Sequence, residues 1–166
     1  MSSPEKPADH SDTIVYSPQT PAAKSPIQEG SAETAAWLEG HNISEVECLV
    51  PDMTGNARGK FIPAHQFLNR TDLKLPESIM VQTVTGEYTD EHWEFVEPTD
   101  TDMLLVPDPK SLRKVPWARE PTAQIIADCY KASGEPHPLA SRNVLKNILS
   151  LYQQAGLRAE VAPEVE

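Results

Sequence analysis

The sequence has few basic residues and no long apolar segment. Its 166 residues include 14 Lys and Arg against 25 Asp and Glu, which gives a net charge of -11. Such an acidic chain without a basic run is poorly suited to a nucleic-acid backbone or an anionic membrane, so we expect neither as a partner. No apolar stretch approaches the roughly 18 residues needed to span a bilayer. The N-terminus also lacks the apolar core of a signal peptide.

Cysteine is equally scarce. Cys48 and Cys129 both lie in apolar runs that are typical of strands. Buried free thiols in a cytoplasmic protein are the simplest interpretation, although the sequence alone leaves a disulfide open. None of the histidines His41, His65, His92 and His137 has a Cys or His neighbour at metal-ligand spacing, so each is expected at the surface or in a turn.

Proline, in contrast, is abundant, with 16 residues. Residues 1–30 are rich in Pro, Ser, Ala and Gln and contain one aromatic residue, Tyr16. A segment of this composition cannot bury enough apolar area to offset its chain entropy. We therefore predict a disordered N-terminal tail before the ordered part of the chain.

From residue 31 onward, the pattern predicts helices and strands without strict alternation, which indicates an α+β fold. The strands at 43–50 and 57–62 should form a hairpin whose five- or six-residue tip carries Asp52, because Pro51 to Asn56 supply turn residues. Other strands are expected at 78–84, 102–106, 123–130 and 157–166, and helices at 31–39, 63–69 and 141–155. The acidic, irregular stretch from Gly86 to Asp100 is long for a connection and is a candidate functional loop.

The last ten residues carry a pair of carboxylates. If 157–166 is a strand, Glu164 and Glu166 point to the same side, with Cα atoms roughly 6.5–7 Å apart. That spacing suits two neighbouring metal ions, one for each carboxylate, at least as well as chelation of one ion. The alternative is a solvated acidic terminus.

Three stretches of the chain, taken in order, resemble the N-terminal part of the glutamine synthetase superfamily. They are Pro51-Asp52-Met53-Thr54-Gly55 leading into Arg58-Gly59-Lys60-Phe61-Ile62-Pro63-Ala64, then Leu105-Val106-Pro107-Asp108-Pro109 with Val115-Pro116-Trp117-Ala118, and finally Ser141-Arg142-Asn143-Val144-Leu145 with Ala162-Pro163-Glu164-Val165-Glu166. The resemblance covers about Ser31 to Glu166. The segments around Gly59 and Pro116 look closer to the γ-glutamylpolyamine synthetase branch than to ammonia-using enzymes.

The resemblance implies a β-grasp-like mixed sheet with packed helices. Residues 31–135 would be the N-terminal domain, and 136–166 would begin the catalytic domain. Family members use ATP and two Mg²⁺ or Mn²⁺ ions to phosphorylate the side chain of glutamate, and an amine or ammonia then displaces the phosphate. They form rings in which the N-terminal hairpin of one subunit closes the active site of the next, so the implied protein partner is a further copy of the chain.

Three residues match functional positions of the family. Glu164 and Glu166 match its metal-binding pair, and Asp52 matches a hairpin aspartate that handles the incoming amine. A carboxylate is suited to this step because it attracts a protonated amine and can accept its proton. The alternative for Asp52 is a turn residue that stabilises the hairpin tip. The cofactor-binding residues for ATP are not identifiable.

The chain also departs from the family, since it stops where the catalytic domain would start. Two carboxylates cannot complete a two-metal site, so we expect a truncated ligase that is inactive alone. The alternative function is a standalone β-grasp interaction module that docks onto an intact synthetase and modulates it. The choice between ammonia and a polyamine is left open by these residues.

Overall fold

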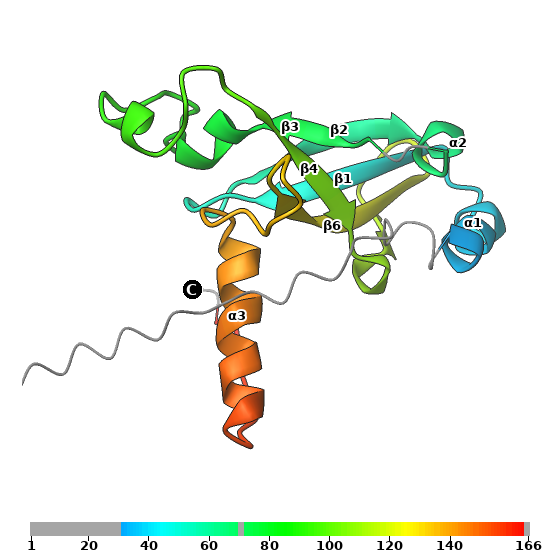
Figure 1. The fold of residues 1–166 in the computed structure, drawn as a ribbon. Helices are drawn as coiled ribbons and strands as arrows, with labels where there is room; N and C mark the ends of the chain where they lie inside the picture. The colour runs from blue at the N-terminus through cyan, green and yellow to red at the C-terminus, as the bar shows by residue number, and fades with distance from the viewer. Residues whose placement is uncertain (1–30, 70–71, 165–166) are drawn as a thin grey trace, which may run out of the picture.

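The computed structural model describes residues 31–69 and 72–164 (Figure 1). The tail predicted for residues 1–30 lies outside this range. Within the described ranges, no helix is both long and apolar enough to cross a membrane.

The fold is built on a six-stranded mixed sheet with the order β2-β1-β6-β4-β3. Strand β6 is central: it runs parallel to β1 and antiparallel to β4, while the short β5 pairs with its beginning. The strands are β1 Glu45–Pro51, β2 Ala57–Pro63, β3 Lys74–Pro76, β4 Asp102–Pro107, β5 Arg113–Lys114 and β6 Thr122–Tyr130. The expected α+β, β-grasp-like fold is therefore confirmed.

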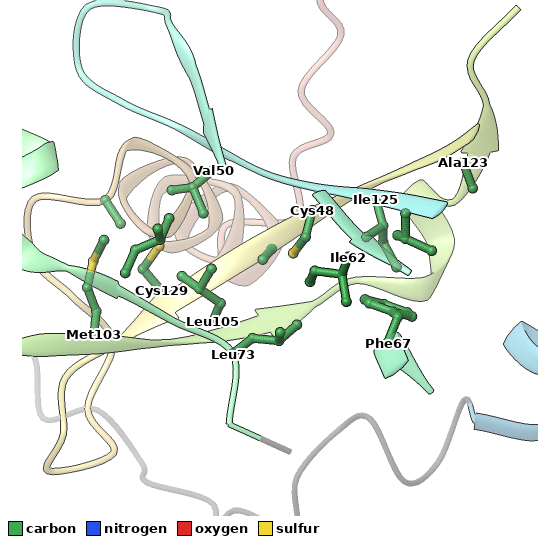
Figure 2. Close-up of a cluster of buried hydrophobic side chains, with 14 of the residues drawn as sticks. Cys48, Val50, Ile62, Phe67, Leu73, Met103, Leu105, Ala123, Ile125 and Cys129 are labelled. Carbon is green, nitrogen blue, oxygen red and sulfur yellow. The ribbon is translucent and has the colours of Figure 1, made fainter. Parts of the chain in front are cut away.

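The position of β6 follows from its sequence. Nearly every residue from Thr122 to Cys129 is buried, as expected for a strand that is covered on both faces. Strand β1 instead alternates, with Val46, Cys48 and Val50 turned into the core. Figure 2 shows side chains from β1, β2, β4 and β6 meeting in one apolar cluster, together with Leu73 and Phe67.

The pairing of β1 with β2 requires a glycine. Gly59 lies opposite Leu49, and a Cβ atom at Gly59 would be 2.1 Å from the carbonyl oxygen of Cys48. Only a residue without a side chain lets the two backbones approach this closely. A larger residue at position 59 would force the two strands apart.

The three α-helices in the described part of the chain differ in how they pack. Helix α1, Ser31–Gly40, contributes Leu38 to the core, and α2, Ala64–Phe67, contributes Phe67. Helix α3, Ser141–Gln154, extends away from the sheet (Figure 1). Apolar residues at spacings of three and four form a stripe along it, and these side chains are roughly half exposed: Val144, Leu145, Ile148, Leu149 and Tyr152.

Two strand predictions were wrong. Residues 77–81 form a 3₁₀ helix, η2 (Glu77–Val81), and only Gln82 makes a β-bridge, to Tyr88. The Asp100 carboxylate accepts hydrogen bonds from the backbone N and Oγ of Ser78, at 3.0 and 2.9 Å, and so fixes the helical turn. Residues 157–164 form no strand either, because no neighbouring strand pairs with them in the described part of the chain.

Candidate functional site

The tip of the β1–β2 hairpin is organised around the carboxylate of Asp52. Its Oδ1 accepts hydrogen bonds from the backbone N of Thr54 at 2.9 Å, the Thr54 hydroxyl at 2.8 Å and the backbone N of Asn56 at 2.9 Å. Its Oδ2 accepts one from Nε of Arg58 at 2.8 Å. Gly55 adopts φ 84° inside the tip, a conformation that glycine reaches without strain. The hairpin tip of five or six residues predicted from turn chemistry is confirmed, since β1 ends at Pro51 and β2 begins at Ala57.

Asp52 is buried, with 3% of the residue exposed. Burial alone would raise its pKa, but the hydrogen bonds from Arg58, Thr54 and Asn56 outweigh this and hold the pKa of Asp52 below its ordinary value. The carboxylate is thus ionised, and its hydrogen-bond donors come from its own hairpin. This geometry is the one expected for the turn residue that the sequence left as an alternative.

The hairpin tip is tied to a second segment of the chain. A terminal nitrogen of Arg58 donates to the carbonyl oxygen of Thr83, and the amide of Asn56 donates to that of Val84, both at 3.0 Å. The segment turns sharply here, with Gly86 at φ 86° and its N–H bonded to Thr83 O. Arg58 therefore joins Asp52 to the start of the acidic stretch.

The stretch from 86 to 100 is irregular, as predicted, and a short 3₁₀ helix, η3 (His92–Glu94), lies within it. His92 is buried between two aromatic rings, with ring centroids 5.0 Å from Tyr88 and 3.9 Å from Trp93. A hydrogen bond between the Tyr88 and Ser78 hydroxyls, at 3.0 Å, attaches the stretch to η2. His92 was expected at the surface or in a turn; it lies in this short 3₁₀ helix but is buried, which was not visible in the sequence because the burial depends on these rings.

A cluster of charges that the sequence did not reveal fixes the beginning of α3. Nε of Arg142 donates to Oδ1 of Asp128 at 2.8 Å, and its terminal nitrogen donates to Asp108. Lys146 pairs with the other oxygen of Asp128. Ser141 also donates to the carbonyl oxygen of Pro51 at 3.0 Å, which places the start of α3 beside the hairpin.

Comparison with known proteins connects this architecture to one group. No family model matches the chain. The glutamate–isopropylamine ligase of Pseudomonas sp is 31% identical over 134 residues, and the match covers 78% of this chain and 29% of that ligase. The gamma-glutamylethanolamide synthetase GlnA4 of Streptomyces coelicolor is 30% identical over 145 residues, covering 82% and 30%. The chain belongs to the glutamine synthetase superfamily.

Solved structures agree on the fold of this glutamine synthetase-like chain. GmaS without ligand superposes with a TM-score of 0.58 and 24% identity, covering 73% of this chain and 26% of that chain. A novel glutamine synthase homologue gives a TM-score of 0.60 at 19% identity, covering 68% and 27%. The chain thus spans about 30% of the length of the curated relatives named above.

The structure describes one of the two terminal carboxylates of this glutamine synthetase-like chain. Glu164 is exposed in a stretch without regular structure, whereas Glu166 lies outside the described residues. In residues 31–69 and 72–164, no group of three or more His, Cys, Asp or Glu side chains could hold a metal ion. A two-metal site needs several oxygens for each ion, so the described residues do not fit such a site by themselves.

His137 was also expected at the surface or in a turn, yet 2% of it is exposed. Its Nδ1 accepts a hydrogen bond from the backbone N of Leu139 at 3.3 Å, which leaves the proton on Nε2. Among the residues that the structure describes, Nε2 has no hydrogen-bond partner, and it lies 3.5 Å from Oε1 of Glu77. Burial lowers the pKa of His137 and nearby Lys131 lowers it further, while Glu77 acts in the opposite direction.

Proposed function

We propose that this chain acts as the N-terminal part of an ATP-dependent ligase that joins glutamate to an amine or ammonia through γ-glutamyl phosphate. The proposal is carried by the match of about four-fifths of the chain to a ligase and a synthetase, at 30–31% identity. The name of the first contains an organic amine, isopropylamine, and the name of the second contains the amide gamma-glutamylethanolamide. Residues 31–135 would form the N-terminal domain, and 136–166 the beginning of the catalytic domain.

For Asp52 we propose the role of binding the incoming amine and accepting its proton. An alkylamine is mostly protonated at neutral pH, and a carboxylate with a lowered pKa keeps the charge that attracts it. Oδ2 accepts one hydrogen bond in the described residues, so it has a further acceptor position. Because the side chain is 1% exposed, an amine could reach that position only if the tip shifted.

Glu164 and Glu166 are proposed as metal ligands, one for each of two Mg²⁺ or Mn²⁺ ions. Such ions would hold the phosphates of ATP and neutralise their charge. Because the described residues do not fit a complete site, we propose that the 166-residue chain has no ligase activity alone. In the ring proposed for the complete enzyme, the hairpin would face the active site of a neighbouring copy.

Two measurements test this function. Purified 166-residue chain incubated with ATP, glutamate and Mg²⁺ should form no γ-glutamyl amide with ammonia, ethanolamine, putrescine or spermidine. The coding DNA should continue past Glu166 into a catalytic domain, and the longer product should turn over. Amide formation by the short chain, or a longer product that binds no glutamate or ATP, would contradict the proposal.

For the identity of the amine substrate, we favour a polyamine or another alkylamine over ammonia. The segment attached to the hairpin tip is rich in exposed carboxylates and aromatic rings, which suit an organic cation. Comparing kcat/KM for spermidine, putrescine and ammonia in the longer product tests this choice. A preference for ammonia would contradict it and leave the ligase proposal intact.

A second candidate function is a standalone module that docks onto an intact synthetase and modulates it. The half-exposed apolar stripe of α3 favours this candidate, because a surface of this kind is usually covered by a partner. A stop codon after Glu166, with co-purification of the chain and an intact synthetase, would support the module. Loss of co-purification in L145D/L149D would place the contact on α3.

A further inference from the structure

The guanidinium of Arg58 lies between oxygen acceptors from two separate segments of the chain. Its Nε donates to Oδ2 of Asp52 at 2.8 Å, and a terminal nitrogen donates to the carbonyl oxygen of Thr83 at 3.0 Å. Gly86 lies beside it without a side chain, since a Cβ at that position would be 4.0 Å from the other terminal nitrogen. A carboxylate and a carbonyl placed in this way can accept hydrogen bonds from any small organic cation that carries several N–H donors.

Arg58 is the member of this arrangement that can leave. Oδ1 of Asp52 is fixed by the turn itself, because it accepts hydrogen bonds from Thr54 and Asn56. Oδ2 accepts from Arg58 alone among the residues that the structure describes. The side chain of Arg58 is 22% exposed, whereas that of Asp52 is 1% exposed. Rotation of Arg58 into solvent is therefore the smallest shift of the tip that would expose Oδ2 without breaking the turn.

We propose that Arg58 occupies the position of the incoming amine, and that an alkylammonium ion binds Asp52 by displacing the Arg58 guanidinium. This inference rests on the function proposed above for Asp52 and adds what controls access to it. A primary ammonium carries three N–H donors on one nitrogen, enough for both Oδ2 and the Thr83 carbonyl. The exchange replaces one cation by another, so the buried carboxylate keeps a counter-charge throughout.

The shape of the Arg58 side chain bears on which cation fits best in its place. Truncation of Arg58 to Ala removes the guanidinium and also the carbon stem that leads to it. An ammonium ion replaces the charged head alone, whereas an alkylammonium ion also places carbon atoms where the stem was. Contact between those carbons and the surrounding side chains is favourable because it removes apolar area from water. We therefore expect R58A to bind ethylammonium more tightly than ammonium.

Chemical rescue of the full chain carrying R58A tests the proposal. Unfolding by urea is measured in about 100 mM sodium, ammonium or ethylammonium chloride, so that the ionic strength is the same in each case. Ethylammonium should raise the urea midpoint of R58A and leave that of the wild type nearly unchanged. For a Kd of about 10 mM, the ratio of folded to unfolded R58A should rise about tenfold. Ammonium should give a smaller rise.

Matched variants show whether the cation binds at Asp52. D52N/R58A lacks the carboxylate, so ethylammonium should act on it no more strongly than sodium. K60A removes an exposed cation from the same strand and should likewise not respond to ethylammonium. If R58A does not fold, the wild type supplies the measurement: ethylammonium should shift the NMR signals of the Thr54 and Asn56 amides, which bond Asp52. That binding should be weaker than in R58A, because Arg58 must first leave.

Two results would overturn the proposal. One is a folded R58A, or a wild type used in its place, that responds to ethylammonium no more than to sodium. The other is a response that persists in D52N/R58A. Failure of the ligase function gives a different result, because a longer product that forms no γ-glutamyl amide contradicts the ligase whether or not rescue occurs. Amide formation by the longer product without rescue of R58A would leave the ligase intact and remove Arg58 from amine binding.

Discussion

Arg58 donates a hydrogen bond from Nε to the Asp52 carboxylate at 2.8 Å and, from the same guanidinium, one to the carbonyl oxygen of Thr83 at 3.0 Å. The hairpin tip and the acidic segment are thus held by one side chain. Lysine cannot reproduce this arrangement, since it has a single nitrogen at the end of its stem.

Replacing Arg58 by Ala should destabilise the chain by about 2–4 kcal/mol, because it leaves the buried Asp52 carboxylate without its counter-charge. Urea unfolding followed by circular dichroism measures the change. K60A, at an exposed position on the same strand, is the matched control and should stay within about 0.5 kcal/mol of the wild type. Equal stability of R58A and K60A would show that the ion pair contributes nothing.

Substitution of Gly59 by Ala should lower the free energy of unfolding more than any substitution at the surface. The added Cβ would meet the carbonyl oxygen of Cys48 at 2.1 Å, so β1 and β2 must separate, at a cost of about 3 kcal/mol or more. G40A is the control, because a Cβ at Gly40 meets no atom of the described residues within 4 Å. Thermal unfolding of both variants makes the comparison, and a G59A variant as stable as G40A would refute the close approach.

The buried His137 should make the protein acid-sensitive well above the range where carboxylates titrate. Its pKa is lower in the folded chain than the ordinary 6.5, so the unfolded chain binds more protons between the two values. The stability that neutral His137 contributes is fully present above pH 6.5 and is lost as the pH falls from there toward the lower folded pKa. Urea unfolding between pH 7.5 and pH 5 measures this loss at intervals of about half a pH unit.

An H137N variant should show a flatter dependence over the same range, since asparagine can accept the Leu139 hydrogen bond and does not titrate. Asp52 titrates in a different window: its pKa is lowered from 3.8, so its contribution is lost only as the pH falls through values below 3.8. An unchanged slope between pH 7 and 5 in H137N would assign the acid sensitivity to another group.

Removing the guanidinium of Arg142 should destabilise α3 more than it destabilises the sheet. R142A loses the contacts to Asp128 and Asp108 while Lys146 still pairs with Asp128, so we expect a loss of about 1–2 kcal/mol. Hydrogen exchange should accelerate in α3 more than in β1 and β6. R158A, which changes an exposed position beyond the helix, should leave the exchange pattern unchanged.

The sequence predicted best those elements whose signal is local. The hairpin tip followed from Pro51 and Gly55, and β6 from a sequence that is the most apolar of the predicted strands. Helix α3 followed from apolar residues at spacings of three and four with Gly156 after them. Gly156 indeed adopts φ 72° just beyond the helix. In each case, a few neighbouring residues determine the backbone conformation.

Features that depend on distant residues were missed. The apolar sequence around Met80 looks like a strand, but Asp100, 22 residues away from Ser78, holds it as a 3₁₀ helix. Likewise, Asp52 was identified as a candidate, whereas its pairing with Arg58 across the hairpin was not predicted. Its catalytic role and the metal-binding roles of Glu164 and Glu166 remain predictions.

The two cysteines give this fold a property of practical use. Burial raises the pKa of the Cys48 and Cys129 thiols to about 12, and both side chains are in the core. A thiol reacts with alkylating reagents as its thiolate, so the native chain should be inert to them. Each modified molecule has therefore undergone an opening of the central strands, so the rate of thiol labelling measures how often the sheet opens.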